Sequence, residues 1–170
     1  MTLQKWVAMD ITHFSGKEVI EIAIRIEENG LEYYTKAANN SRSERLGELF
    51  LFLAEEEKKH KKIFEEFGRQ LQDEKLPGVF DPYLNEESRY LMALANSRVF
   101  TDPNEGSRLA NNVHKDVEIL KTAIDLEKDS ILFYYELQRA IRDQDKPVLG
   151  SLIDEEKNHL KKLTELQKSI

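Results

Sequence analysis

The chain has no cysteine among its 170 residues. This absence excludes disulfide bonds, thiolate catalysis, iron–sulfur clusters and any cysteine-ligated iron within the sequence. Glycine and proline are also scarce, with 7 and 4 residues. The prolines separate long uninterrupted segments, as is typical of helices; they are Pro77, Pro82, Pro103 and Pro147.

Long apolar runs are absent as well. No stretch approaches the roughly 18 consecutive apolar residues of a membrane span, and residues 1–17 lack the apolar core of a secretory signal. We therefore expect a cytoplasmic protein that does not bind membranes. The formal net charge of −7 argues against nucleic acid as a partner. A chain of this length with 40% hydrophobic and 34% charged residues is typical of one helix-rich domain, here 1–170.

Four segments carry residues at alternating steps of three and four, the period of a packed helix face. A capping box at Ser15 and Glu18 precedes the first segment, and Pro147 opens the fourth. The apolar positions, segment by segment, are Ile20, Ile24, Leu31, Tyr34 and Ala38; Leu46, Phe50, Leu53, Phe64, Phe67 and Leu71; Val113, Val117, Leu120, Ile124, Ile131, Tyr134 and Ile141; and Leu149, Leu152, Leu163, Leu166 and Ile170.

The two halves of the chain resemble each other. Residues 23–27 (AIRIE) align with 123–127 (AIDLE), and residues 55–60 (EEEKKH) align with 154–159 (DEEKNH). We therefore expect an all-α four-helix bundle with a pseudo-twofold axis, built from two helical hairpins. The hairpins are predicted at 15–70 and 113–168, and a long crossover at 71–112 joins them. The crossover holds three of the prolines and a short helical piece near 86–98.

Six polar side chains occupy positions on these otherwise apolar faces: Glu27, Glu57, His60, Glu127, Glu156 and His159. An isolated ionised carboxylate in a core costs many kcal/mol unless it is protonated or paired. No lysine or arginine lies on the same faces, so four carboxylates in one core layer require another source of positive charge.

Two divalent metal ions would neutralise the four carboxylates, and the two imidazoles would complete the ligand set. Side chains at i and i+3 lie about 5–6 Å apart at Cβ on a helix, so each Glu-x-x-His pair converges on one point. One Glu from each of two helices and a Glu-x-x-His pair from each of the other two form a dinuclear carboxylate site in a bundle. Mixed oxygen and imidazole ligands suit iron or manganese, at a separation of roughly 3.5–4 Å.

Simpler interpretations apply to some of these residues. A single Glu-x-x-His pair would indicate helix surface, whereas two copies in matched halves favour the metal site. Tyr34 and Tyr134 fit a role as core residues and a role as hydrogen-bond donors to ligands equally well. Side chains without an expected role are Tyr33 and Tyr135, His13 and His114 at the surface, and Glu28, Glu55, Glu56, Asp154 and Glu155 on solvated faces.

The segments AIRIEENGLEYY, AEEEKKH, AIDLEKDSILFYY and IDEEKNH resemble the rubrerythrin branch of the ferritin-like superfamily, over roughly 15–70 and 113–168. The resemblance implies a ferritin-like bundle with two iron ions, for which manganese or zinc are substitutes. Its ligands would be the six polar residues above, with Glu57 and Glu156 bridging and Glu27 and Glu127 terminal. It also implies reduction of H₂O₂ or O₂, as a peroxidase or ferroxidase in oxidative stress or iron handling.

The chain departs from full-length rubrerythrins in two ways. It lacks a cysteine-rich rubredoxin domain, so we expect a separate electron donor, such as a rubredoxin-type protein or a reductase, or Fe(II) itself. Ser130 stands where rubrerythrins carry an additional glutamate ligand. Alternative functions are ferritin-like iron storage, a diiron hydroxylase, and a structural bundle whose site is vestigial or holds zinc. A homo-oligomer, a dimer or larger, is also expected.

Overall fold

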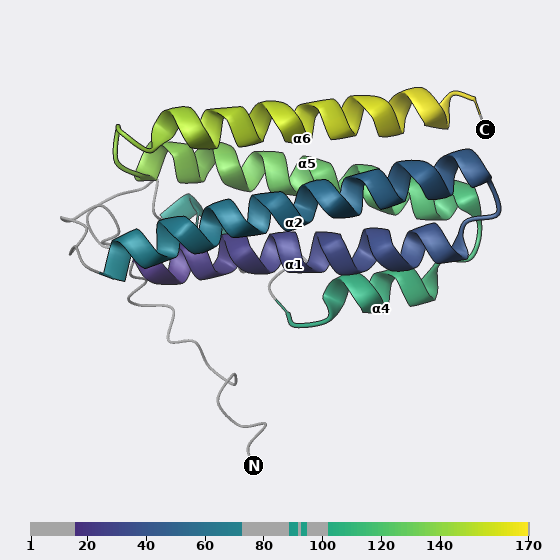
Figure 1. Ribbon diagram of the computed structural model, residues 1–170, viewed down its shortest axis with the longest axis horizontal. Helices are drawn as coiled ribbons and strands as arrows, with labels where there is room; N and C mark the ends of the chain where they lie inside the picture. Colours follow the sequence, from purple (N-terminus) through teal and green to yellow (C-terminus); the bar gives the residue numbers. More distant parts are fainter. Residues whose placement is uncertain (1–15, 73–88, 92, 95–101, 170) are drawn as a thin grey trace, which may run out of the picture.

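The computed structural model describes residues 16–72, 89–91, 93–94 and 102–169, and it is helical through most of this part of the chain. Its helices are α1 (Gly16–Asn40), α2 (Glu44–Gln72), α4 (Glu105–Asn112), α5 (Asp116–Ala140) and α6 (Lys146–Gln167). The four long helices lie side by side as two antiparallel hairpins, α1 with α2 and α5 with α6 (Figure 1). This arrangement is the expected four-helix bundle.

A short turn at 41–43 links α1 to α2, and it is tied to the second hairpin. The carboxylate of Asp116, at the start of α5, accepts hydrogen bonds from the backbone N–H groups of Arg42 and Ser43, both at 3.0 Å. These donors precede α2, where free N–H groups and the helix dipole favour a negative charge. Asp116 therefore joins one end of the first hairpin to the second.

Helix α4 belongs to the crossover and packs against α1 (Figure 1). The buried side chain of Asn29 accepts a hydrogen bond from the N–H of Gly106 at 3.2 Å and donates one to the carbonyl of Asp102 at 3.1 Å. A Cβ atom on Gly106 would lie 1.8 Å from the carbonyl oxygen of Asn29, so only glycine permits this approach. The sequence interpretation did not anticipate α4.

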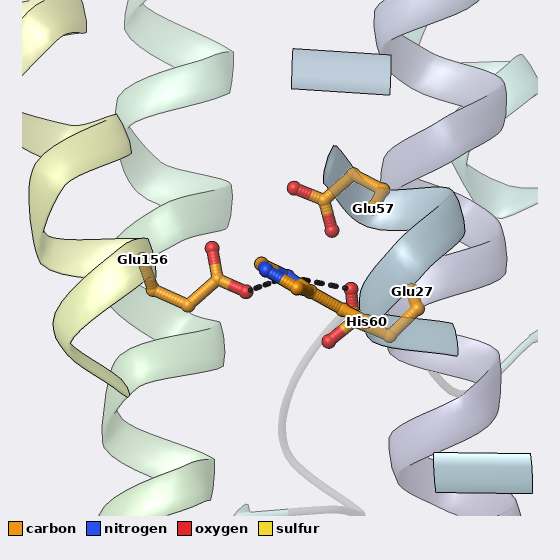
Figure 2. Close-up of side chains that lie close together, drawn as sticks. All are labelled: Glu27, Glu57, His60 and Glu156. Atoms are coloured by element: carbon orange, nitrogen blue, oxygen red, sulfur yellow. Dashed lines mark ion pairs between the residues drawn. The ribbon is translucent and has the colours of Figure 1, made fainter. Parts of the chain in front are cut away.

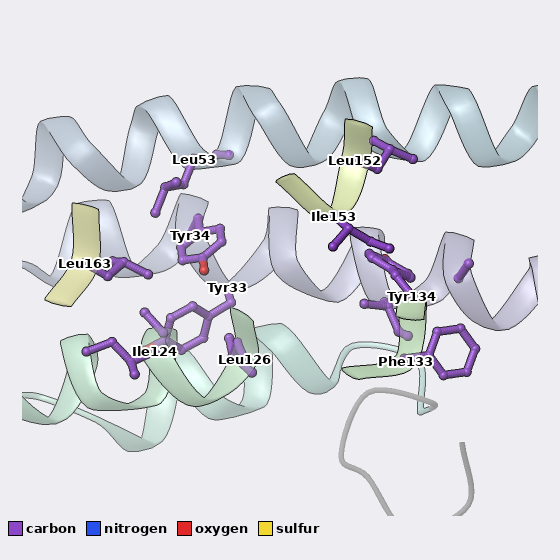
Figure 3. Packing of buried hydrophobic residues seen from close by; sticks show 14 of the residues in the cluster. Tyr33, Tyr34, Leu53, Ile124, Leu126, Phe133, Tyr134, Leu152, Ile153 and Leu163 are labelled. Carbon is purple, nitrogen blue, oxygen red and sulfur yellow. The ribbon is translucent and has the colours of Figure 1, made fainter. Parts of the chain in front are cut away.

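The core lies between the hairpins and is filled by the aliphatic and aromatic residues of the packed helix faces (Figure 3). The structure corrects the start and end of the third predicted segment. Val113 is extended and follows α4, Val117 is 56% exposed, and Ile141 follows the last turn of α5. The buried face of α5 therefore begins at Ile119 and Leu120, because the helix itself starts only at Asp116.

Some expectations concern residues outside the described part of the chain. Ser15 of the capping box, His13, Leu71 as a side chain, and Ile170 belong to this group. The short helical piece expected near 86–98 is helical at 89–91 and 93–94. No helix among the described residues combines the length and apolar character needed to cross a membrane.

We expect Gly106→Ala to lower the thermal unfolding temperature, because the new methyl group collides with backbone rather than with a movable side chain. Overpacking of this kind costs about 1–3 kcal/mol. The matched control is Gly68→Ala in α2, where the nearest atom to the added Cβ is a methyl carbon of Ile20 at 3.6 Å. That variant should unfold at the same or a higher temperature, because alanine favours helix. Equal effects of the two substitutions in calorimetry would contradict the close packing of α4.

Candidate metal centre

The structure brings the six polar residues predicted on the helix faces into one buried cluster. Each of the four long helices contributes: α1 and α5 one glutamate each, and α2 and α6 a Glu-x-x-His pair each. Their exposed fractions are at most 5%. The residues are Glu27, Glu57, His60, Glu127, Glu156 and His159.

The cluster divides into two overlapping groups of four potential ligands. The first is Glu27, Glu57, His60 and Glu156, and Figure 2 shows these side chains converging from three helices. The second group is Glu57, Glu127, Glu156 and His159. Glu57 and Glu156 belong to both groups, so each group takes three residues from one hairpin and one from the other.

The spacing of the ligand atoms fits a metal ion. Within each group, one nitrogen or oxygen atom per residue lies within 4.8 Å of all the others. Atoms bound to one cation at about 2.0–2.2 Å lie up to about 4.4 Å apart, so small rotations about side-chain bonds would complete the coordination. The two histidine rings stack with centroids 5.6 Å apart and an interplanar angle of 17°, and each presents Nδ1 to the carboxylates.

Unpaired polar atoms support the same conclusion. Among the described residues, three buried side-chain atoms have no hydrogen-bond partner: Glu27 Oε2, His60 Nδ1 and Glu156 Oε1. His60 Nδ1 is 2.8 Å from Glu156 Oε1, but the ring does not point at that oxygen with hydrogen-bond geometry. Buried polar atoms rarely lack partners. All three belong to the first group, so a cation there would satisfy them together.

Two tyrosines hold the outer glutamates across the hairpins. The hydroxyl of Tyr34 in α1 donates to Glu127 Oε1 in α5, and that of Tyr134 in α5 donates to Glu27 Oε1 in α1. Both tyrosines are buried, and burial followed by the nearby carboxylates raises their pKa well above the usual value. They are therefore neutral donors. Glu27 keeps Oε2 near His60 Nδ1, at 3.6 Å, whereas Glu127 Oε1 accepts from Tyr34 and also lies 3.7 Å from His159 Nδ1.

Protons compensate part of the carboxylate charge in the metal-free protein. Burial and the charge of Glu156 raise the pKa of Glu57 and of Glu127 well above the usual range. Burial alone would lower the pKa of His60, but Glu156 and Glu27 raise it to about 12. Burial would raise the pKa of Glu156, yet His159 and His60 hold it well below its usual range.

Two residues expected on solvated faces lie close to the histidines instead. Glu155 is half exposed, but its carboxylate accepts a hydrogen bond from His60 Nε2 at 2.8 Å. Glu56 has a side chain that is only 17% exposed, and its hydrogen bond with Lys59 lowers its pKa against the effect of burial, with smaller contributions from Lys59, His159 and His60 as neighbours. The sequence contains one indication of this contact: each of the two residues directly precedes the glutamate of a Glu-x-x-His pair.

The remaining expectations concern residues outside the cluster. Tyr33 is buried and donates to the carbonyl of Ile119 at 2.6 Å, so it fastens α1 to α5. Tyr135 is 41% exposed, beneath the ammonium of Lys157. Of the other positions expected to be solvated, His114, Glu55 and Asp154 are exposed. Glu28 is half exposed and pairs with Lys61 at 2.8 Å.

Comparisons with known proteins agree with this geometry. The family model described as Rubrerythrin matches residues 18–96. A crystal structure from Thermotoga maritima, assigned to the ferritin-like diiron-carboxylate proteins, is 30% identical with a TM-score of 0.66 and covers 92% of this chain and 96% of its own. The chain belongs to the rubrerythrin-like, ferritin-like diiron-carboxylate proteins. No curated protein sequence matches it.

Membership of the diiron-carboxylate proteins implies iron binding. The cluster of this rubrerythrin-like chain could hold metal ions, because it offers oxygen and imidazole ligands in two groups of suitable spacing. Iron accepts such mixed ligands.

We expect the stability of the metal-free protein to fall as the pH rises from 5 to 8. Glu57, Glu127 and His60 have folded-state pKa values above those of the unfolded chain. Their contribution to stability is complete below the unfolded-state pKa values, about 4.3 for Glu and 6.5 for His. It then decreases progressively as the pH rises toward the folded-state pKa. Each excess proton in the folded state contributes about 1.4 kcal/mol per pH unit. The lowered pKa of Glu156 matters only at more acidic pH.

Thermal unfolding in the presence of a chelator measures this dependence. Glu57→Gln removes one of the titrating carboxyl groups at nearly constant shape, so its unfolding temperature should vary less with pH. The exposed Glu55→Gln serves as the control on the same helix. A wild-type protein that becomes steadily more stable between pH 5 and 8 would contradict the assignment of protons to the cluster.

Proposed function

We propose that this chain is a non-haem diiron redox enzyme that reduces H₂O₂ or O₂, as a rubrerythrin-like peroxidase or ferroxidase. The observation that carries the proposal is the pair of overlapping ligand groups that share Glu57 and Glu156 in a buried layer. A structural bundle would gain nothing from four carboxylates in its core, whose burial is costly. A binuclear redox site accounts for all six residues.

The shared membership suggests the role of each ligand. Glu57 and Glu156 would supply oxygen ligands at both metal positions, because both groups include them. Glu27 with His60 would complete one end, and Glu127 with His159 the other. The tyrosine hydroxyls would fix the orientation of the two terminal glutamates, since partners of this kind hold ligands in place and tune the metal.

A small cavity beside the cluster favours a small oxidant. It lies between α1, α2 and α5, next to Glu57 and Glu127, and has about 10 Å³ for the centre of a water-sized sphere, close to the minimum for one water. Gly30 helps to form it, because a Cβ there would lie 3.1 Å from Glu57 Oε2. Ser130 lines the same cavity. O₂ or H₂O₂ matches this space better than the organic substrate of a hydroxylase.

Each part of the site would serve this chemistry. Iron supplies one electron per ion when bound, and two electrons together with two protons convert H₂O₂ into two molecules of water. The buried apolar residues around the ligands exclude bulk water, and the paired carboxylates balance the charge of the ions. The electrons would come from a separate donor, such as a rubredoxin-type protein or a reductase.

Anaerobic titration with Fe(II) should saturate near two ions per chain, because the ligands form two groups. Addition of H₂O₂ should then oxidise the centre faster than O₂ does, as followed by absorbance in stopped flow. Faster oxidation by O₂ with accumulation of iron mineral would favour a ferroxidase or storage role. Protein that binds no Fe(II), or that is purified with tightly held zinc, would overturn the diiron proposal.

Replacement of a shared ligand provides a second test. Glu57→Ala or Glu156→Ala should reduce Fe(II) binding from about two ions to less than one per chain, since either change removes a ligand from both groups. The helix content should persist, because a buried carboxylate is lost rather than an apolar contact. Circular dichroism checks the fold, and Glu55→Ala is the control at an exposed position of α2. An unfolded Glu57→Ala protein would contradict the expected neutral effect on the fold.

A further inference from the structure

The two ends of the cluster differ in how their histidines are supported. His60 donates from Nε2 to the carboxylate of Glu155 at 2.8 Å, which directs Nδ1 toward the ligand group. His159 is equivalent to His60 in the repeat, and Glu56 is equivalent to Glu155. The described residues include no hydrogen bond between Glu56 and His159, and the carboxylate of Glu56 pairs with Lys59 instead. The pseudo-twofold symmetry is therefore broken at this pair.

One difference between the two motifs explains the broken symmetry. Lys59 lies one turn after Glu56, and its ammonium pairs with that carboxylate. The equivalent of Lys59 in the second motif is Asn158, which carries no charge to attract Glu155. Glu155 is therefore available to His60, whereas Glu56 is held by its own helix.

A second difference concerns the space beside each histidine. The ring of Phe52 stands edge-on to His159 with centroids 6.3 Å apart, and the ammonium of Lys162 lies 3.9 Å from the centre of that ring. The position equivalent to Phe52 in the second half is Ser151, which is too small to cover His60 in the same way. One histidine thus has an aromatic and cationic neighbourhood, and the other has a carboxylate.

We propose that Glu155 is a positioning residue that makes the two metal positions unequal, so that the position at His60 fills first and more tightly. The inference rests on the proposed diiron function. A carboxylate that accepts from the outer nitrogen of a histidine fixes its tautomer and orientation and strengthens it as a ligand. Loss of such a partner typically weakens metal binding about 10–100-fold, and His159 lacks one from Glu56.

Calorimetric titration of the metal-free protein with Co²⁺ alone tests the proposal, with visible absorbance reporting the order of filling. The wild type should bind two ions in steps that differ about 10–100-fold in affinity. Glu155→Ala should weaken the tighter step by a similar factor. Glu155→Gln should weaken it less, because the amide oxygen still accepts the hydrogen bond. This graded response distinguishes positioning from a general effect on the fold.

Four further variants make the design specific. Asp154→Asn removes a neighbouring exposed carboxylate that pairs with Lys157 rather than with a histidine, so both steps should stay unchanged. Lys59→Asn should free Glu56 to bind His159 and tighten the weaker step, bringing the two affinities together. His159→Ala should retain the tight step, and His60→Ala should lose it.

The outcomes separate the inference from the proposed function. Two ions bound with equal affinity, or steps that Glu155→Ala leaves unchanged, would overturn the inequality while leaving the binuclear site intact. A tight step that survives His60→Ala would show that the tighter position is not at His60 and would overturn the proposal. Failure of the wild type to bind two ions at all would instead count against the diiron function itself.

Discussion

The burial of four glutamates in one core layer is the constraint on which the rest of the site depends. Carboxylates removed from water must be protonated, paired or bound to metal, and the structure provides for each. Two histidines and two tyrosine hydroxyls face the carboxylates, burial raises the pKa of Glu57 and Glu127, and three atoms are left for a cation. The surrounding aliphatic and aromatic core holds these groups at fixed separations.

Much of the cluster could be predicted from the sequence, because it depends on helical period. Glu27, Glu57 and His60 each lie one turn from apolar residues on the same face, and the second half repeats the pattern. Given that those faces pack together, the convergence of the six side chains follows. For Tyr34 and Tyr134 the sequence allowed two roles, core residue or hydrogen-bond donor to a ligand. The structure shows that each hydroxyl donates to a glutamate of the other hairpin, and this depends on which helices are neighbours.

Other features depend on tertiary contacts that local patterns do not encode. Helix α4 is only eight residues long, and isolated helices of that length are marginal in water. The hydrogen bonds of Asn29 in α1 to Gly106 of α4 and to Asp102 just before it help to stabilise it. Glu155 looks like a solvated residue because its side chain is half exposed, and its contact with His60 depends on the absence of a competing lysine on its own helix. The solvated interpretation failed where a polar side chain reached across to another hairpin.

The hydrogen bonds of the two tyrosines across the hairpins show that the cluster needs residues from both halves of the chain. Each outer glutamate accepts a hydrogen bond from a tyrosine of the other hairpin. Each ligand group likewise contains one glutamate from the other hairpin, Glu156 in the first group and Glu57 in the second. A hairpin by itself therefore contains neither a complete ligand group nor the donor that orients its own terminal glutamate. A complete set of ligands therefore requires both hairpins, so the ligand cluster forms at the interface between the two halves of the chain.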